Sequence, residues 1–255
     1  MNICIDVGNS TIGFGAYKGE SLFERMIIST NPYFTEEEFI QLFKKPFAYA
    51  ENKGEKIDKI IYSSVVPQVD VPLISALKKL TGIEPLRISN NIRTGLTLNV
   101  DNPREVGNDL IADLVGAKMK YSYPTIVADL GTASKILLLD HNGAFSSCLI
   151  MPGLTLSAKS LSDKAALLPE VSLIAPDSIM AKNTLAAMNA GIVYGHADMI
   201  LGLIKRYEEE LGYHCKRILT GGGAVYIKDI VKDEFIYDQN LNLDGLNIII
   251  AKNSK

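Results

Sequence analysis

Apolar residues in this chain gather into short runs of strand length, and the same series of runs occurs twice. Residues 2–6, 11–17 and 22–29 are three such runs separated by short polar turns, a pattern typical of an antiparallel β-meander. A second set of three runs begins just past the middle of the chain, at residues 125–129, 135–140 and 145–150. We therefore expect two β-meanders, one in each half of the chain.

Helical patterns follow each predicted meander. Thr35 precedes three consecutive glutamates, the pattern of a helix N-cap with an acidic first turn. The first half continues with a predicted strand at 59–66 and a helix at 71–80, and a helix at 108–120 leads into the second half. The second half continues with predicted helices at 155–167 and 183–211 and strands at 217–219 and 247–251. Strands alternating with helices predict a mixed α/β fold.

Each meander carries the same short motif where its first strand ends. Residues 5–10 read Ile-Asp-Val-Gly-Asn-Ser, and residues 128–133 read Ala-Asp-Leu-Gly-Thr-Ala. The two aspartates, Asp6 and Asp129, are separated by nearly half of the 255 residues. An internal repeat at half the chain length predicts two similar domains that face each other across a cleft. We place these domains at residues 1–117 and 118–255.

The repeated motif suits a site that holds the phosphates of a nucleotide. A carboxylate cannot bind phosphate directly, so Asp6 and Asp129 would act through Mg²⁺, its waters or a monovalent cation. Lys135, close to the second motif, would either neutralise charge there or face solvent. Direct phosphate contacts would come from backbone N–H groups and small polar side chains. These candidates are Gly8, Asn9, Ser10, Gly131, Thr132 and Ala133.

Two further segments could carry chemistry. Gly221 and Gly222 belong to a glycine-rich turn after a predicted strand, where a flat ring or a phosphate could approach the backbone closely. Gly107 and Asn108 form a predicted turn before Asp109, which stands at the start of a helix. Asp109 is either a helix cap or a base that accepts the proton of a substrate hydroxyl, and Asp113, one helical turn further on, is the alternative base.

Composition excludes several classes of function. The net charge of −3, without a dense run of lysine or arginine, argues against a nucleic-acid partner. No apolar run approaches the roughly 20 residues needed to span a bilayer, and the N-terminus lacks the pattern of a signal peptide. The three cysteines, at positions 4, 148 and 215, are scattered. We therefore expect a cytoplasmic protein with reduced thiols and no membrane partner.

Short motifs spread from residue 6 to residue 224 resemble those of the type III pantothenate kinases. The matching segments begin at Asp6, Ser64, Asn102, Asp129, Pro152, Leu168, Lys182, Gly191 and Thr220. The resemblance implies an α/β fold of duplicated ribonuclease-H-like domains, as in actin-like ATPases and sugar kinases, with mixed sheets flanked by helices. It also implies a cytoplasmic homodimer that phosphorylates pantothenate to 4'-phosphopantothenate with Mg²⁺-ATP, the first step of coenzyme A biosynthesis.

The resemblance assigns roles to single residues. Asp109 would be the catalytic base, Asp6 would act through the Mg²⁺-bound phosphates, and Asp129 would hold a monovalent cation, K⁺ or NH₄⁺. Gly107 would lie against pantothenate, and Thr184 would reach it from the partner subunit. Gly221 and Gly222 would border the adenosine. The full set expected at the substrate is Val100, Gly107, Asn108, Leu110 and Thr184.

Two of these substrate positions depart from the family pattern. An arginine that contacts pantothenate in the family is replaced by Leu110, and a tyrosine near the substrate is replaced by Val100. Leucine donates no hydrogen bond, so an anionic group of the substrate would need another partner. Arg93 and Arg104 are the nearest candidates in sequence. The alternatives are a kinase of the same fold with another small hydroxylated substrate, or an ATP-binding regulator without turnover.

Overall fold

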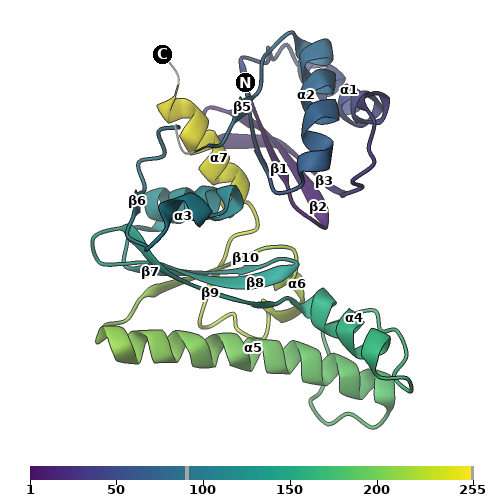
Figure 1. Ribbon diagram of the computed structural model, residues 1–255, viewed down its shortest axis with the longest axis vertical. Coiled ribbons are helices and arrows are strands. Elements are labelled where there is room, and N and C mark those ends of the chain that lie inside the picture. Colours follow the sequence, from purple (N-terminus) through teal and green to yellow (C-terminus); the bar gives the residue numbers. More distant parts are fainter. Residues whose placement is uncertain (90–91, 254–255) are drawn as a thin grey trace. The chain divides into compact units, whose positions relative to one another are not determined.

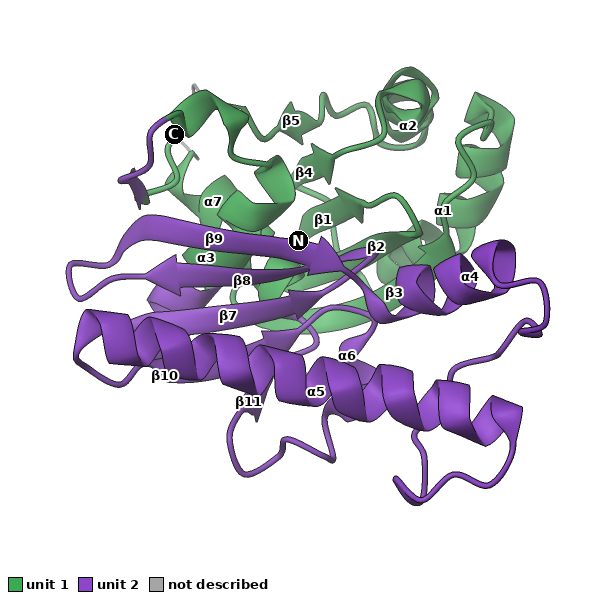
Figure 2. Ribbon diagram, turned by 60° about the horizontal axis from the view of Figure 1, so that its bottom comes forward, with its two compact units in different colours: residues 1–96, 102–116, 241–255 green, residues 97–101, 117–240 purple. Residues whose placement is uncertain are grey.

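The computed structural model describes residues 1–89 and 92–253. The chain forms two compact units, drawn in green and purple in Figure 2. Unit 1 comprises residues 1–96, 102–116 and 241–255, and unit 2 comprises residues 97–101 and 117–240. This division differs from the expected one at residue 117, because the C-terminal segment joins unit 1 and a short segment before Asn102 joins unit 2.

Unit 1 is built on a five-stranded mixed sheet in the order β3-β2-β1-β4-β5. The strands are β1 (Asn2–Val7), β2 (Thr11–Lys18), β3 (Ser21–Ser29), β4 (Lys59–Ser64) and β5 (Leu86–Arg87). Strands β1, β2 and β3 pair antiparallel, which confirms the first predicted meander. Strands β4 and β5 extend the sheet on the other side of β1 by parallel pairing.

Helices cover both faces of this sheet. They are α1 (Glu36–Asn52), α2 (Pro67–Thr81), α7 (Leu241–Lys252) and the first part of α3 (Asn108–Tyr121), with a short 3₁₀ turn η1 (Pro103–Glu105) before α3. Thr35 caps α1, and Glu38 completes the capping box, as the sequence predicts. Helices α1 and α2 share a core with one face of the sheet, in which Phe14 and Phe43 are fully buried. Helices α3 and α7 share a second core with the other face.

The strand predicted at residues 247–251 is wrong, because this segment belongs to helix α7. Leu246, Ile249 and Ile250 are buried against the sheet of unit 1 in the same core as Leu243. A short unbroken apolar run fits a buried strand and a buried helix equally well. Packing of this segment against the sheet of unit 1 decides between the two.

Unit 2 repeats the sheet of unit 1. Its strands follow the order β11-β10-β7-β8-β9-β6. They are β6 (Thr97–Leu98), β7 (Thr125–Leu130), β8 (Ala133–Leu139), β9 (Ala144–Pro152), β10 (Lys216–Thr220) and β11 (Ile236–Tyr237). An antiparallel meander of β7, β8 and β9 is followed by parallel β10 and β11, as in unit 1, and β6 adds one edge strand. The equivalent strand orders support the duplication inferred from the repeated motif.

The long helix α5 (Thr184–Leu211) covers one face of this sheet, together with α4 (Leu154–Lys164) and the short α6 (Ala224–Ile227). Val193, Ala197, Ile200 and Ile204 form its buried stripe. Among the described helices, α5 alone is long and apolar enough to cross a membrane, a test that core helices also pass. Because its apolar stripe packs in the core, we assign α5 to the helical layer that covers the sheet of unit 2.

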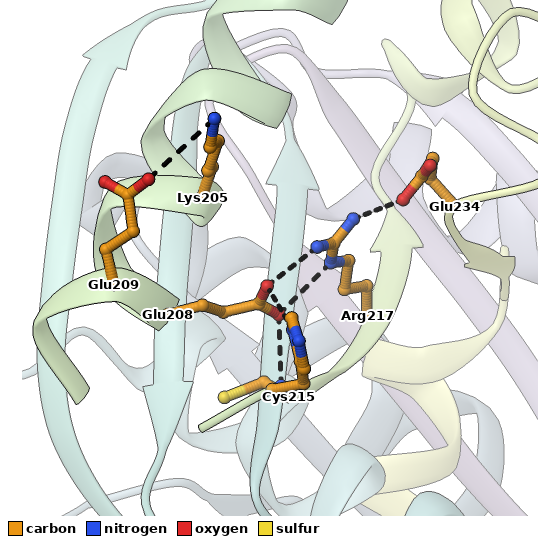
Figure 3. Close-up of polar contacts among 7 residues, drawn as sticks. Lys205, Glu208, Glu209, Cys215, Arg217 and Glu234 are labelled. Carbon is orange, nitrogen blue, oxygen red and sulfur yellow. Dashed lines mark hydrogen bonds and ion pairs between the residues drawn. The ribbon is translucent and has the colours of Figure 1, made fainter. Parts of the chain in front are cut away.

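A polar cluster ties the end of α5 to the start of β10 (Figure 3). Glu208 accepts hydrogen bonds from the backbone N–H of Cys215 at 3.0 Å and from Arg217 Nη2 at 2.8 Å. His214 Nδ1 lies 3.0 Å from the same carboxylate, and Arg217 also pairs with Glu234. Burial raises the pKa of Glu208, but these donors outweigh it and hold the pKa at about 2. The cluster therefore fixes where β10 starts and, through it, where the glycine turn after β10 lies.

Candidate functional site

In unit 1 the repeated motif forms the turn between β1 and β2. The backbone N–H of Gly8 donates to the carbonyl of Thr11 at 2.9 Å, and Thr30 Oγ1 donates to the carbonyl of Gly8 at 2.7 Å. These bonds hold the turn, and Asn9 and Ser10 are exposed at its tip. Asp6 lies one residue before the end of β1, so a single hairpin carries all four candidates of this motif.

In unit 2 the motif forms the equivalent turn between β7 and β8. Gly131 and Thr132 connect the strands, and Ala133 is the first residue of β8. The backbone N–H of Gly153 donates to the carbonyl of Thr132 at 3.0 Å. A Cβ on Gly153 would lie only 2.2 Å from the carbonyl oxygen of Gly131, so only glycine allows the two segments to pack. The segment after β9 thus packs against the turn at Gly131 and Thr132 and stabilises it.

The glycine turn after β10 lies directly on the end of β7. Gly221 adopts φ +86°, and a Cβ there would lie 2.5 Å from Asp129 Oδ1. The backbone N–H of Gly223 donates to the carbonyl of Leu130 at 2.7 Å. Gly222 is exposed and has no atom within 4 Å of its Cβ position. The structure therefore brings together two segments that are about 90 residues apart, with an open stretch of backbone at Gly222.

Lys135 is the residue of this region whose role the sequence leaves open. It is the cross-strand partner of Asp129 in the β7–β8 ladder, and its Nζ lies 2.7 Å from Asp129 Oδ2. The two side chains are 17% and 12% exposed, so the lysine does not face solvent. Its neighbour Ser134 points to the other face, where its Oγ lies 2.7 Å from His196 Nε2 on α5. Burial lowers the pKa of His196, which favours a neutral imidazole in this contact.

The predicted base lies at the start of α3 in unit 1. Asp109 is the second residue of that helix and is half-buried. Its carboxylate turns back over Gly107, because a Cβ on Gly107 would lie 2.5 Å from Asp109 Oδ1. Asn242 of α7 donates to the backbone carbonyl of Asp109 at 3.2 Å. The helix N-terminus favours the ionised form of a carboxylate at this position.

An open groove of about 480 Å³ lies beside this helix start, within unit 1. Its lining is Val65, Arg87, Ile88, Ser89, Arg104, Glu105, Val106, Gly107 and Asn108. Two arginines thus face the groove together with two of the expected substrate residues. Arg87 Nη2 also pairs with the buried Asp70 at 3.0 Å.

The remaining substrate candidates divide between the units. Leu110 is buried, with its Cγ 3.6 Å from the Cβ position of Gly107, so it lies behind the glycine. Val100 is half-buried in the short segment of unit 2 that follows β6. Thr184 is exposed at the start of α5, which Asn183 caps by accepting from the N–H of Ala186. The groove therefore includes Gly107 and Asn108 but neither Val100 nor Thr184.

Metal-binding side chains are sparse in both units. Across residues 1–89 and 92–253, no three His, Cys, Asp or Glu side chains gather closely enough to hold a metal ion. All three cysteines have free thiols. A Mg²⁺ ion that keeps several waters and binds substrate phosphates needs only one or two protein carboxylates. Asp6, at the predicted phosphate turn of unit 1, is compatible with that kind of site, whereas Asp129 is paired with Lys135.

Comparison with known proteins identifies the family. The sequence model of type III pantothenate kinase matches residues 2–206. The chain belongs to the type III pantothenate kinase family. A type III pantothenate kinase of Exiguobacterium sibiricum is 39% identical over 253 residues, covering 99% of this chain and 100% of that protein. The kinase activity expected from the resemblance is thus the activity for which its full-length relatives are named.

Solved structures confirm the fold class. A putative Baf family transcriptional activator from Campylobacter jejuni superposes with a TM-score of 0.60 at 21% identity, covering 98% of both chains. An archaeal actin homologue superposes with a TM-score of 0.50 at 13% identity, covering 99% of both chains. At such low identity these structures bear on the fold alone. The duplicated actin-like architecture expected from the sequence is confirmed.

Proposed function

We propose that this chain transfers the γ-phosphoryl group of ATP to the hydroxyl group of pantothenate, the first step of coenzyme A biosynthesis. The observation that carries the proposal is the position of Asp109, whose carboxylate lies against Gly107 beside a groove with two arginines, in a member of this family. A carboxylate beside a bound alcohol can accept its proton as the oxygen attacks phosphorus.

The hairpin turn of each unit and the glycine turn of unit 2 are each proposed to contact ATP. Backbone N–H groups at the turns of Gly8 and Gly131, with the side chains of Asn9, Ser10 and Thr132, would bind phosphate oxygens. The open backbone at Gly222 and its neighbour Gly221 would border the adenosine. Mg²⁺, held through Asp6 and the phosphates, would neutralise charge on the transferred group.

The acceptor groove would bind the carboxylate of pantothenate through its arginines. Arg104 is exposed in the turn η1, and Arg87 reaches the same groove from β5. A guanidinium can bind a carboxylate through two parallel N–H donors. Arg93, the other candidate from the sequence, does not line the groove, and its backbone instead pairs with Asn253. We therefore propose that Arg104 and Arg87 compensate for Leu110.

A homodimer is part of the same proposal. The segment from α4 to the start of α5 exposes large apolar side chains: Leu161, Leu167, Ile174, Ile179, Met180 and Leu185. Leu167 is 95% exposed and Met180 is 77% exposed, which is typical of a surface that a second subunit covers. Thr184 lies in this segment, so a partner subunit docked here would bring its own Thr184 to the interface. We also propose that the protein acts in the cytoplasm, as the sequence leads us to expect.

The monovalent cation is the one cofactor for which the residues fit poorly. The resemblance places K⁺ or NH₄⁺ at Asp129, but the ammonium of Lys135 lies 2.7 Å from that carboxylate. A second cation would have to share Asp129 with a charge of the same sign. We therefore propose Mg²⁺-ATP as the cofactor requirement, with Asp129 occupied by a side chain.

A kinase for another small hydroxylated substrate is the second candidate, and the buried Leu110 favours it. An ATP-binding regulator without turnover would not need Asp109 beside the groove. Pantothenate-dependent ADP release from Mg²⁺-ATP separates the three. Release with pantothenate supports the proposal, release only with other alcohols supports the second candidate, and tight ATP binding without release supports the regulator.

The base assignment is tested by Asp109→Asn. We expect a loss of kcat of about 10³-fold, with ATP binding retained, because proton transfer contributes about 10²–10⁴-fold. Asp113→Asn, one helical turn further on, separates this base from the alternative at that position. Asp101→Asn, an exposed acid, is the control. An unchanged kcat for Asp109→Asn would overturn the assignment.

The acceptor groove is tested by Arg104→Ala and Arg87→Ala. We expect each variant to raise KM for pantothenate about tenfold, as expected for loss of one charged hydrogen bond, with KM for ATP unchanged. Arg93→Ala, outside the groove, is the matched control. An equal effect of all three substitutions would contradict a specific role for the groove arginines.

A further inference from the structure

The ion pair between Lys135 and Asp129 is built into the β7–β8 hairpin. The two residues are direct partners in the antiparallel ladder, so their side chains project from the same face of the sheet. The neighbouring pair of the ladder, Leu130 with Ser134, projects to the opposite face, toward α5. Because side chains alternate between the two faces along each strand, the backbone register itself places Lys135 next to Asp129.

The pair lies where the proposed phosphate site of unit 2 is formed. Asp129 Oδ1 is beside the backbone of Gly221, and Oδ2 is beside Lys135 Nζ. The carboxylate is therefore enclosed by the glycine turn on one side and the ammonium on the other. Two residues beyond Asp129, the turn at Gly131 begins. A positive charge at this position is within the part of unit 2 that would face an ATP phosphate.

A lysine ammonium and a bound potassium or ammonium ion play the same electrostatic role beside a carboxylate. Each brings one compact positive charge to Asp129, and each can contact a phosphate oxygen on its other side. With Lys135 in contact, the carboxylate is already neutralised at low exposure, where screening by salt is weak. An additional monovalent cation would meet the ammonium as a like charge.

We propose that Lys135 is a built-in monovalent cation, so that ATP binding and turnover by this chain require no K⁺ or NH₄⁺. The proposal rests on the proposed role of unit 2 in ATP binding. It concerns the cation alone and is independent of which alcohol accepts the phosphoryl group. Lys135 would hold its charge at the phosphates permanently, tethered by β8.

The test compares cations at constant ionic strength. Mg²⁺-ATP affinity of the full chain is measured by calorimetry in potassium, ammonium, sodium and choline chloride, with pantothenate-dependent ADP release measured in parallel. We expect ATP affinity and rate to differ less than twofold among the four salts. A loss of tenfold or more in choline, restored by potassium, would overturn the proposal.

A substitution should restore the need for a free ion. In Lys135→Thr we expect ATP affinity to fall at least tenfold in choline and to recover in potassium or ammonium chloride. Lys135→Arg keeps a charge near Asp129 and should remain independent of the salt. Lys18→Thr is the control, since Lys18 also lies on a strand and pairs with an acid, Glu55, at 2.6 Å, but far from the phosphate turn of unit 2 in sequence.

Stability provides a readout that does not need substrate. Removal of Lys135 leaves Asp129 buried without its ammonium, so Lys135→Thr should melt at a higher temperature in potassium than in choline. A Lys135→Thr protein with equal melting temperatures and equal ATP affinity in all four salts would overturn the proposal. Failure of the wild-type protein to bind ATP in any salt would overturn the proposed function and this inference with it, whereas salt-dependent binding overturns only the inference.

Discussion

The two halves of this chain carry the same aspartate at the end of the same strand, but the residue opposite each aspartate differs. In unit 1, Asp6 faces Gly13 across the β1–β2 ladder, and in unit 2, Asp129 faces Lys135 across the β7–β8 ladder. Glycine offers no side chain to the carboxylate, whereas lysine offers a full positive charge. The duplicated fold therefore supplies two similar carboxylates, of which Asp129 has a lysine as its cross-strand partner and Asp6 has a glycine.

The same difference extends to the arginines of the two units. In unit 2, Arg217 pairs with both Glu208 and Glu234, so its charge serves the fold. In unit 1, Arg87 pairs with Asp70 but is 48% exposed and lines the groove. Arg217 is thus used by ion pairs within unit 2, while Arg87 both pairs with Asp70 and lines the groove of unit 1. This difference agrees with an acceptor site in unit 1.

Among the tests of this comparison, we expect the largest effect from removing the aspartate that faces glycine. We expect Asp6→Asn to lower kcat by about a hundredfold or more, because the neutral amide binds Mg²⁺ poorly. Asp129→Asn should cost about tenfold or less, since Lys135 still supplies the positive charge. Steady-state kinetics at saturating ATP measure both. Equal losses for the two variants would show that the hairpins are equivalent and would break the comparison.

The polar cluster around Glu208 should make the free energy of unfolding depend on pH. The pKa of Glu208, held at about 2 instead of its usual 4.5, contributes about 3 kcal/mol to stability at neutral pH. Because the folded-state pKa is the lower one, this contribution is complete above about pH 4.5 and is lost as pH falls toward 2. Glu208→Gln should remove it, as measured by urea unfolding between pH 3 and 7.

A neighbouring acid provides the control for that measurement. Glu209 pairs with Lys205 at 3.8 Å on the exposed side of α5, where the two side chains are 64% and 76% exposed (Figure 3). Exposed pairs of this kind contribute about 0–1 kcal/mol. We expect Glu209→Gln to leave the unfolding free energy nearly unchanged. A larger loss for Glu209→Gln than for Glu208→Gln would contradict the assignment of the cluster to the fold.

Adjacent glycines should respond differently to the same substitution. Gly221→Ala places a Cβ 2.5 Å from Asp129 Oδ1 at φ +86°, so we expect a loss of about 2 kcal/mol or more of stability. Gly222→Ala has no atom within 4 Å of the new Cβ and should fold normally. Thermal unfolding with and without ATP measures both. If Gly221→Ala had the melting temperature of the wild type, our description of the glycine turn as closely packed on Asp129 would be wrong.

The smallest effect is expected from a substitution that gives the first hairpin the residue pair of the second. Gly13→Lys would place an ammonium opposite Asp6, and the new Cβ would have ordinary contact with Leu243 at 3.9 Å. We expect the Mg²⁺ concentration for half-maximal activity to rise about tenfold, because the ammonium competes with the metal ion for one carboxylate. Titration of activity with Mg²⁺ measures the shift. No shift would indicate that Asp6 does not act through the metal ion.

Most of the fold follows from local pattern. The alternation of apolar and polar residues predicts both meanders, and Thr35 with its glutamates predicts the start of α1. The repeat of Asp6 and Asp129 predicts the duplication, which the equivalent strand orders support. The segment at 247–251 was wrongly predicted as a strand, because an unbroken apolar run has no period from which to tell helix from strand. Its packing against the sheet of unit 1, far away in sequence, decides the outcome.

The sequence by itself determined the elements, the repeat and the residue types of the candidate site, because these depend on neighbours along the chain. The tertiary structure alone decided which of them meet. Gly221 lies on Asp129 through the parallel pairing of β10 with β7, and Arg87 joins Arg104 in one groove. Lys135 had two possible environments in the sequence, and cross-strand register selects one of them. Register and long-range pairing depend on the whole sheet, so no local pattern contains them.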